Sequence, residues 1–113
     1  MKVVITENRL ERIAVKWLND NYGDLEPFES EIYPDNIFYR KGDNVIFEYN
    51  KINGVVLINY NEIWSFFESY FDMEYQQIQD LTKIWVEEHY NLRVTTTETQ
   101  YQYDWYRWRN ITI

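Results

Sequence analysis

The stretch 36–60 constrains the fold most strongly, because its apolar residues recur with a period of two and turn signals interrupt them twice. Residues 41–44, with sequence Lys-Gly-Asp-Asn, separate the first two apolar runs, and Asn53-Gly54 separates the second from the third. Asn-Gly is typical of a type I′ hairpin turn, whose two central residues both need positive φ. The pattern therefore predicts a three-stranded antiparallel meander.

A two-residue turn at Asn53-Gly54 would set Phe47 opposite Tyr60 and Tyr49 opposite Ile58. One face of the meander is then apolar and the other is mixed, so the apolar face needs helices to cover it. The predicted core face carries Val45, Phe47, Tyr49, Val56, Ile58 and Tyr60, and the mixed face carries Ile46, Glu48, Asn50, Leu57 and Asn59.

Three other stretches have the helical period: 6–22, 61–71 and 73–90. Their predicted inward residues are Leu10, Ile13, Ala14, Trp17 and Leu18, then a broad aromatic face from Ile63 to Phe71, then Ile78, Leu81, Ile84 and Trp85. Residues 24–35 read as an extended loop or edge strand, and the β-branched and aromatic residues of 93–113 as a strand. The sequence predicts one α+β domain over residues 1–113, a meander covered on one face by three helices, with an extra C-terminal strand.

The charge of the chain limits the kinds of partner that it is expected to bind. The net charge is −8, and in residues 61–92 only Lys83 offsets the carboxylates Glu62, Glu68, Asp72, Glu74, Asp80, Glu87 and Glu88. Duplex nucleic acid is an unfavourable ligand for such a chain, whereas a protein with a basic surface suits it. The absence of cysteine, of a signal-peptide pattern and of a long apolar run indicates a cytoplasmic protein without a membrane segment.

Residues that commonly build enzyme sites are scarce. His89 is the only histidine and there is no cysteine, so a metal site of these ligands cannot be completed. No nucleophile motif surrounds a serine, and the three glycines are isolated, which excludes a phosphate-binding glycine loop. A pair of carboxylates stays open as a hydrolytic site. We expect no catalytic activity, no cofactor and no metal, with His89 at a helix C-terminus where the dipole favours its ring.

Two aromatic segments are candidate contact sites. Phe67, Tyr70 and Phe71 either all belong to the core or form an exposed patch that binds a partner. Toward the C-terminus, strand alternation over 101–109 leaves neither face purely apolar, which favours an edge strand with its arginine side open. Alternatively, this segment stacks the bases of single-stranded nucleic acid. The candidate residues there are Trp105, Arg107, Trp108 and Arg109.

The residues Ile63-Trp64-Ser65-Phe66-Phe67-Glu68, Ile78-Gln79-Asp80 and the run from Trp85 to Arg93 resemble stretches of small uncharacterised accessory proteins of tailed phages. The resemblance covers about a third of the chain and implies no activity or site residue. With the charge pattern, it favours a non-enzymatic protein–protein interaction module, a viral accessory or regulatory factor that binds a basic surface on a host or phage protein. The acidic residues of 24–35 and 61–92 are most simply solvated faces, and alternatively they imitate a nucleic-acid backbone and occupy a basic groove of a host protein. Alternatives are a single-stranded nucleic-acid binder and a minor virion structural protein.

Overall fold

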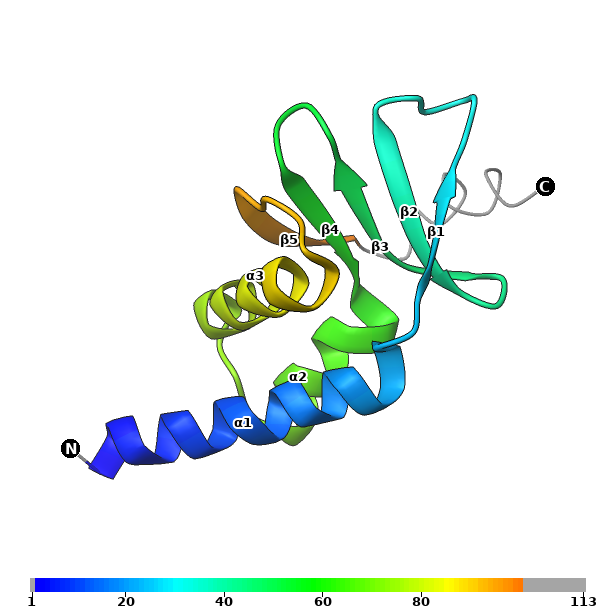
Figure 1. The fold of residues 1–113 in the computed structure, drawn as a ribbon. Helices are drawn as coiled ribbons and strands as arrows, with labels where there is room; N and C mark the ends of the chain where they lie inside the picture. Colours follow the sequence, from blue (N-terminus) through cyan, green and yellow to red (C-terminus); the bar gives the residue numbers. More distant parts are fainter. Residues whose placement is uncertain (1, 101–113) are drawn as a thin grey trace.

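Five strands form one mixed sheet in which spatial order follows chain order, β1-β2-β3-β4-β5. The computed structural model describes residues 2–100 (Figure 1). Neighbouring strands are antiparallel from β1 to β4, whereas β5 lies parallel to β4. The elements are α1 Lys2–Tyr22, β1 Glu26–Glu29, β2 Asn36–Lys41, β3 Asn44–Asn50, β4 Val55–Asn59, the π-helical segment η1 Tyr60–Trp64, α2 Ser65–Tyr70, α3 Tyr75–Tyr90 and β5 Thr96–Gln100.

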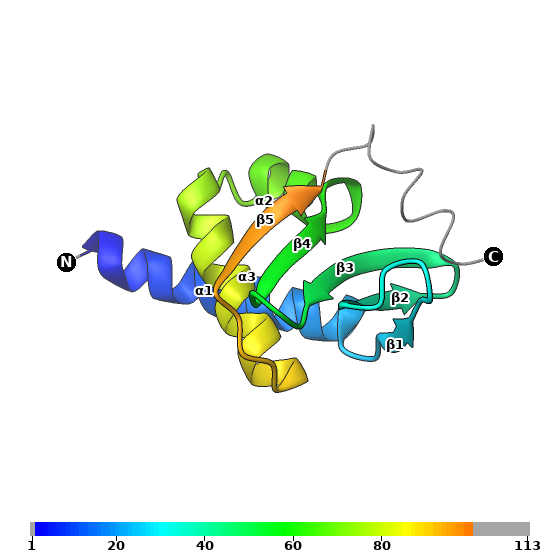
Figure 2. The same cartoon turned by 90° about the horizontal axis from the view of Figure 1, so that it is seen from above.

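The predicted α+β meander is confirmed as β2, β3 and β4. The three helices lie on one side of the sheet, as Figures 1 and 2 show together. Their buried side chains meet the sheet in one apolar core, whose largest fully buried members include Trp64, Trp85, Phe47, Phe67 and Leu18. The acidic stretch after α1 supplies β1 at one edge, and residues from the predicted C-terminal strand region supply β5 at the other.

The pairing of β3 with β4 differs from the prediction by two residues. Phe47 lies opposite Ile58 and Tyr49 opposite Val56, so the predicted pairs of Phe47 with Tyr60 and of Tyr49 with Ile58 are wrong. A shift by an even number keeps every side chain on its face. Phe47, Tyr49, Val56 and Ile58 are therefore buried in the core as expected, while Tyr60 opens η1 and is only partly buried.

The shift arises because the turn is longer than two residues. Residues 51–54 form the loop, and the Gly54 amide donates to the Asn50 carbonyl at 2.9 Å. The Asn50 side-chain oxygen accepts from the amides of Ile52 and Asn53 at 2.9 and 3.0 Å, which holds the wider loop. Such a side-chain turn competes with the two-residue form that Asn53-Gly54 favours.

A β-bulge places two residues of β3 on the sheet face opposite to the one predicted for each. Arg40 lies opposite Val45 and Tyr39 opposite Phe47, so Ile46 is an extra residue on β3. Ile46 joins the main core, and Val45 joins a small apolar cluster on the opposite face of the sheet. The prediction placed these two residues the other way round.

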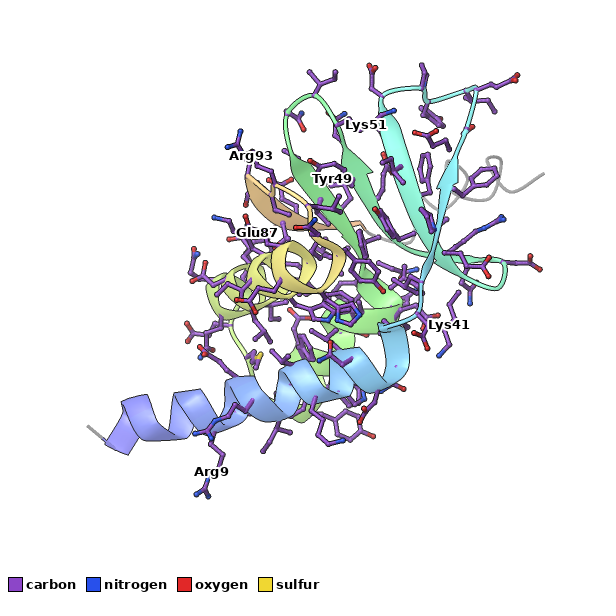
Figure 3. The ribbon with its side chains drawn as sticks, in the orientation of Figure 1. Arg9, Lys41, Tyr49, Lys51, Glu87 and Arg93 are labelled. Atoms are coloured by element: carbon purple, nitrogen blue, oxygen red, sulfur yellow. The ribbon has the colours of Figure 1, made fainter. Side chains whose placement is uncertain are left out.

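Strand β5 is held where it enters the sheet. The Tyr49 hydroxyl donates to the Arg93 carbonyl at 3.0 Å, and the Thr95 amide donates to the Gly54 carbonyl at 2.8 Å. Figure 3 shows Tyr49 and Arg93 at this end of the sheet, with Lys41 beside the C-terminal end of α1. Gly54 has φ +75°, and a Cβ there would lie 2.7 Å from the Thr95 hydroxyl oxygen. Both its conformation and its neighbours therefore require glycine.

Each outer strand of the described sheet has a feature that limits further pairing. On β1, Pro27 has no amide proton, and Glu26 and Glu29 are exposed. On β5, the Gln79 side-chain amide from α3 donates to the Thr97 carbonyl at 2.9 Å.

Candidate interaction surfaces

The structure separates the three aromatic residues that the sequence grouped as a contact site. Phe67 is 0% exposed and lies edge-on against the rings of Trp17 and Phe71, with ring centroids 5.5 Å away in both cases. Its inclusion in an exposed patch is therefore corrected, because α2 turns this side chain into the core. Phe71 is partly buried against the same core, and Tyr70 is 78% exposed.

Tyr70 ends a stack of three rings that joins α1 to α2. The Trp17 and Phe66 rings lie 4.1 Å apart with an interplanar angle of 6°, and the Phe66 and Tyr70 rings lie 4.5 Å apart at 25°. We call Trp17, Phe66 and Tyr70 the aromatic stack. Its first two members are partly buried against the core, whereas Tyr70 extends into solvent. The i, i+4 spacing of Phe66 and Tyr70 is visible in the sequence, but their alignment with Trp17 depends on how α1 crosses α2.

Carboxylates of η1 and α2 take part in hydrogen bonds with nearby tyrosines. Glu68 accepts from the Tyr60 hydroxyl at 2.9 Å, and Glu62 accepts from the Tyr22 hydroxyl at 2.9 Å. Burial, and then the hydrogen bond and negative charge of Glu62, raise the pKa of Tyr22 well above its usual value. The segment from η1 to α2, which carries Phe66 and Tyr70 of the aromatic stack, therefore has an acidic character.

A groove separates α1 from α3 on another side of the molecule. Its main cavity has a volume of about 460 Å³ and is lined by Glu11, Arg12, Val15, Asp80, Leu81 and Ile84. Smaller cavities of about 170 and 160 Å³ share lining residues with it and continue it toward the start and the end of both helices. We call this continuous depression the α1–α3 groove.

The groove explains why Ile84 is 49% exposed, although the helical period predicted it to be inward. On α3, the core takes Ile78, Leu81 and Trp85, and Ile84 lies beside them on the groove wall. Ile13 on α1 is 51% exposed, so the prediction that this side chain points inward is also wrong. The core follows Ala14 and Leu18 on that helix, and one residue turns the side chain by about 100° around the helix axis.

A buried polar cluster lies on the sheet face opposite the helices. Glu48 is 2% exposed, and its carboxylate accepts a hydrogen bond from the Asn36 side-chain amide. Asn36 in turn accepts from the Asn50 side chain at 2.8 Å, beside a cavity of about 150 Å³. Strand alternation predicted the face of Glu48 and Asn50, but their hydrogen bonds to β2 depend on the strand register.

His89 lies in the last turn of α3, as expected. Its Nε2 atom is 2.8 Å from the Gly23 carbonyl oxygen, which can only accept, so this nitrogen carries the proton and donates. Within the described part of the chain, no three His, Cys, Asp or Glu side chains gather closely enough to hold a metal ion. The geometry gives His89 a role in joining the C-terminal ends of α1 and α3.

The C-terminal candidates lie outside the described residues, which end at Gln100 in β5. The roles of Trp105, Arg107, Trp108 and Arg109 in an edge strand or in nucleic-acid binding therefore stay predictions.

No protein-family model matches the chain, and neither a curated protein nor a solved structure matches it. None of the helices over residues 2–100 has both the length and the apolar character needed to cross a membrane.

Proposed function

We propose that this chain is a non-enzymatic protein–protein interaction module that contacts a basic partner through the aromatic stack. The observation that carries the proposal is the position of Tyr70, which is exposed to solvent while Phe66 and Trp17 hold the stack against the core. A ring that is already positioned loses little conformational freedom on binding. Tyrosine and tryptophan are also the residues that most often dominate interface energies.

The charge pattern supports a basic partner. The chain has a net charge of −8, and Glu68 lies on the same short helix as Phe66 and Tyr70. Lysine and arginine side chains around an apolar contact would approach such a surface faster and bind it more tightly at low salt. The resemblance to phage accessory proteins makes a host or phage protein in the cytoplasm the partner that we propose, with a minor virion role as an alternative.

A second candidate function is the binding of single-stranded nucleic acid, because exposed aromatic rings also stack bases. The carboxylates near the aromatic stack weigh against it, since they repel phosphates. Its best candidates, Trp105, Arg107, Trp108 and Arg109, belong to the segment outside the described residues.

The test compares Tyr70→Ala with Ile52→Ala, which removes an equally exposed apolar side chain from the β3–β4 loop. Each immobilised variant and the wild type capture proteins from an extract of the cells in which the chain is made. The captured protein is then purified and titrated at several salt concentrations. We expect Tyr70→Ala to weaken binding by about tenfold or more and Ile52→Ala to leave it unchanged.

Two results would count against the proposal. One is a dissociation constant that Tyr70→Ala does not change. The other is tighter binding to a single-stranded oligonucleotide than to any captured protein, which would favour the second function instead.

A further inference from the structure

The walls of the α1–α3 groove are two helical rows with the same chemical order. Glu11, Val15 and Asn19 follow one another at i, i+4 and i+8 on α1, and Asp80, Ile84 and Glu88 do so on α3. The two apolar residues meet the central cavity, with Leu81 beside them, while the ends of both rows are polar. Each row is about 12 Å long, because a helix rises about 1.5 Å per residue.

We propose that the α1–α3 groove binds one amphipathic helix of a partner protein, with an apolar stripe flanked by lysine or arginine residues. Two such rows form the ridges and grooves into which a third helix packs. A length of about 12 Å matches about eight residues of that helix, so its apolar contacts recur at i, i+3 or i+4, and i+7.

The backbone chemistry of the groove selects a helix over an extended peptide. A helix forms its own backbone hydrogen bonds, whereas a bound strand needs donors and acceptors from the surface that it joins. The groove walls are side chains of two helices, whose backbone groups are already paired within α1 and α3. An apolar centre made by Val15, Leu81 and Ile84 offers a strand no such partners.

Charge selects a basic helix. Glu11 and Asp80 lie toward one end of the groove and Glu88 toward the other, and among the described side chains that line the three cavities there is one guanidinium, that of Arg12. Carboxylates at both ends can pair with cationic residues that flank an apolar stripe. A second copy of this chain is disfavoured as the occupant, because each copy has a net charge of −8.

This site is separate from the aromatic stack. Val15 and Trp17 are two residues apart on α1, which places their side chains about 200° apart around the helix axis. The groove can therefore bind its helix while the aromatic stack contacts another surface, and the inference does not depend on the proposed function.

The test begins with selection of displayed random peptides of about 16 residues, roughly four helical turns, on the wild-type protein. A selected peptide is synthesised and titrated against wild type, Ile84→Arg and Ile13→Arg. The last is a matched control, because Ile13 is 51% exposed and Ile84 is 49% exposed, but only Ile84 lines the groove. The new arginine at position 84 has carboxylates one turn away on either side, Asp80 and Glu88, so we expect the fold to tolerate it.

We expect the selected peptides to be basic, to carry apolar residues at helical spacing and to gain helical circular dichroism on binding. Ile84→Arg weakens binding by about tenfold or more, and Ile13→Arg changes it by less than about twofold. Asp80→Lys weakens it as well, with a smaller salt dependence than wild type.

The inference is overturned if no peptide is enriched over a selection without protein, or if the enriched peptides bind in an extended form or lack basic residues. Equal losses from Ile84→Arg and Ile13→Arg also overturn it, as does a wild-type dimer in sedimentation that Ile84→Arg dissociates. Melting temperatures of all variants are measured first, so that a folding defect is recognised as such.

Discussion

Replacing Phe67 by alanine tests most directly whether α2 presents its rings to the core or to a partner. The side chain is fully buried and touches the rings of Trp17 and Phe71 edge-on, with Phe66 at a centroid distance of 6.3 Å. Removing a buried phenylalanine costs about 3–5 kcal/mol of unfolding free energy through lost burial and the remaining cavity. Loss of two edge-to-face contacts places Phe67→Ala toward the upper part of that range.

The same reasoning predicts a small effect for Tyr70→Ala. Tyr70 is largely exposed, and among the residues that the structure describes its one close ring neighbour is Phe66 at 4.5 Å, so its removal should cost less than about 1 kcal/mol. For a domain of this size, 1 kcal/mol corresponds to about 4 °C in melting temperature. We expect Phe67→Ala to melt roughly 12–20 °C below wild type and Tyr70→Ala to melt within about 4 °C of it.

Urea unfolding, followed by tryptophan fluorescence and by far-ultraviolet circular dichroism, measures both free energies. Coincident transitions from the two signals establish that unfolding is two-state. The reasoning is refuted if Phe67→Ala costs less than about 1 kcal/mol, since a fully buried ring cannot be removed so cheaply. It also fails if Tyr70→Ala is the more destabilising substitution.

Three further predictions concern stability. The hydroxyls of Thr82 and Thr97 are fully buried and lie 2.7 Å apart. Each single change to valine should therefore lower the unfolding free energy, measured in urea, by about 1–2 kcal/mol, and the double variant should lose less than the sum of the two. Strictly additive losses would contradict this. Burial raises the pKa of Tyr90 from 10.0 to about 12, so the unfolded chain releases this proton first. The contribution of Tyr90 to stability should therefore be fully present below pH 10 and be lost between pH 10 and 12, so that Tyr90→Phe shows a shallower fall than wild type over this range, and equal slopes would contradict this. EDTA should leave the melting temperature unchanged, and a shift of several degrees would reveal an oxygen-ligand cation site.

The meander was predictable because its signals are local. Alternation places Phe47, Tyr49, Val56 and Ile58 on one face for any register that differs by an even number of residues, and Asn53-Gly54 marks the turn. The loop length depends on Asn50 accepting two amide hydrogen bonds, and no periodicity encodes that competition. The bulge at Ile46 is not visible in the periodicity either, because the extra residue lies within the apolar run of β3.

The candidate surfaces were less predictable because they depend on how elements cross. The helical period identifies Ile84 as apolar and next to Leu81, but only the packing of α1 against α3 decides which of the two is exposed. The sequence placed Phe66 and Trp17 on apolar helical faces, yet their 4.1 Å stacking needs two segments far apart in the chain to meet. The parallel direction of β5 has a similar cause, since it depends on where α3 returns the chain to the sheet.

The features that limit further pairing of the two outer strands, β1 and β5, affect how copies of this protein interact at high concentration. A further strand beside β1 would face a proline without an amide proton and two exposed glutamates. At β5, the Thr97 carbonyl already accepts a hydrogen bond from the Gln79 side chain. Sheet growth from copy to copy, the first step toward fibrils, is thereby hindered at both ends. In a chain this rich in tyrosine, isoleucine and phenylalanine, these features limit strand pairing with other copies at the two edges of the sheet that residues 2–100 form.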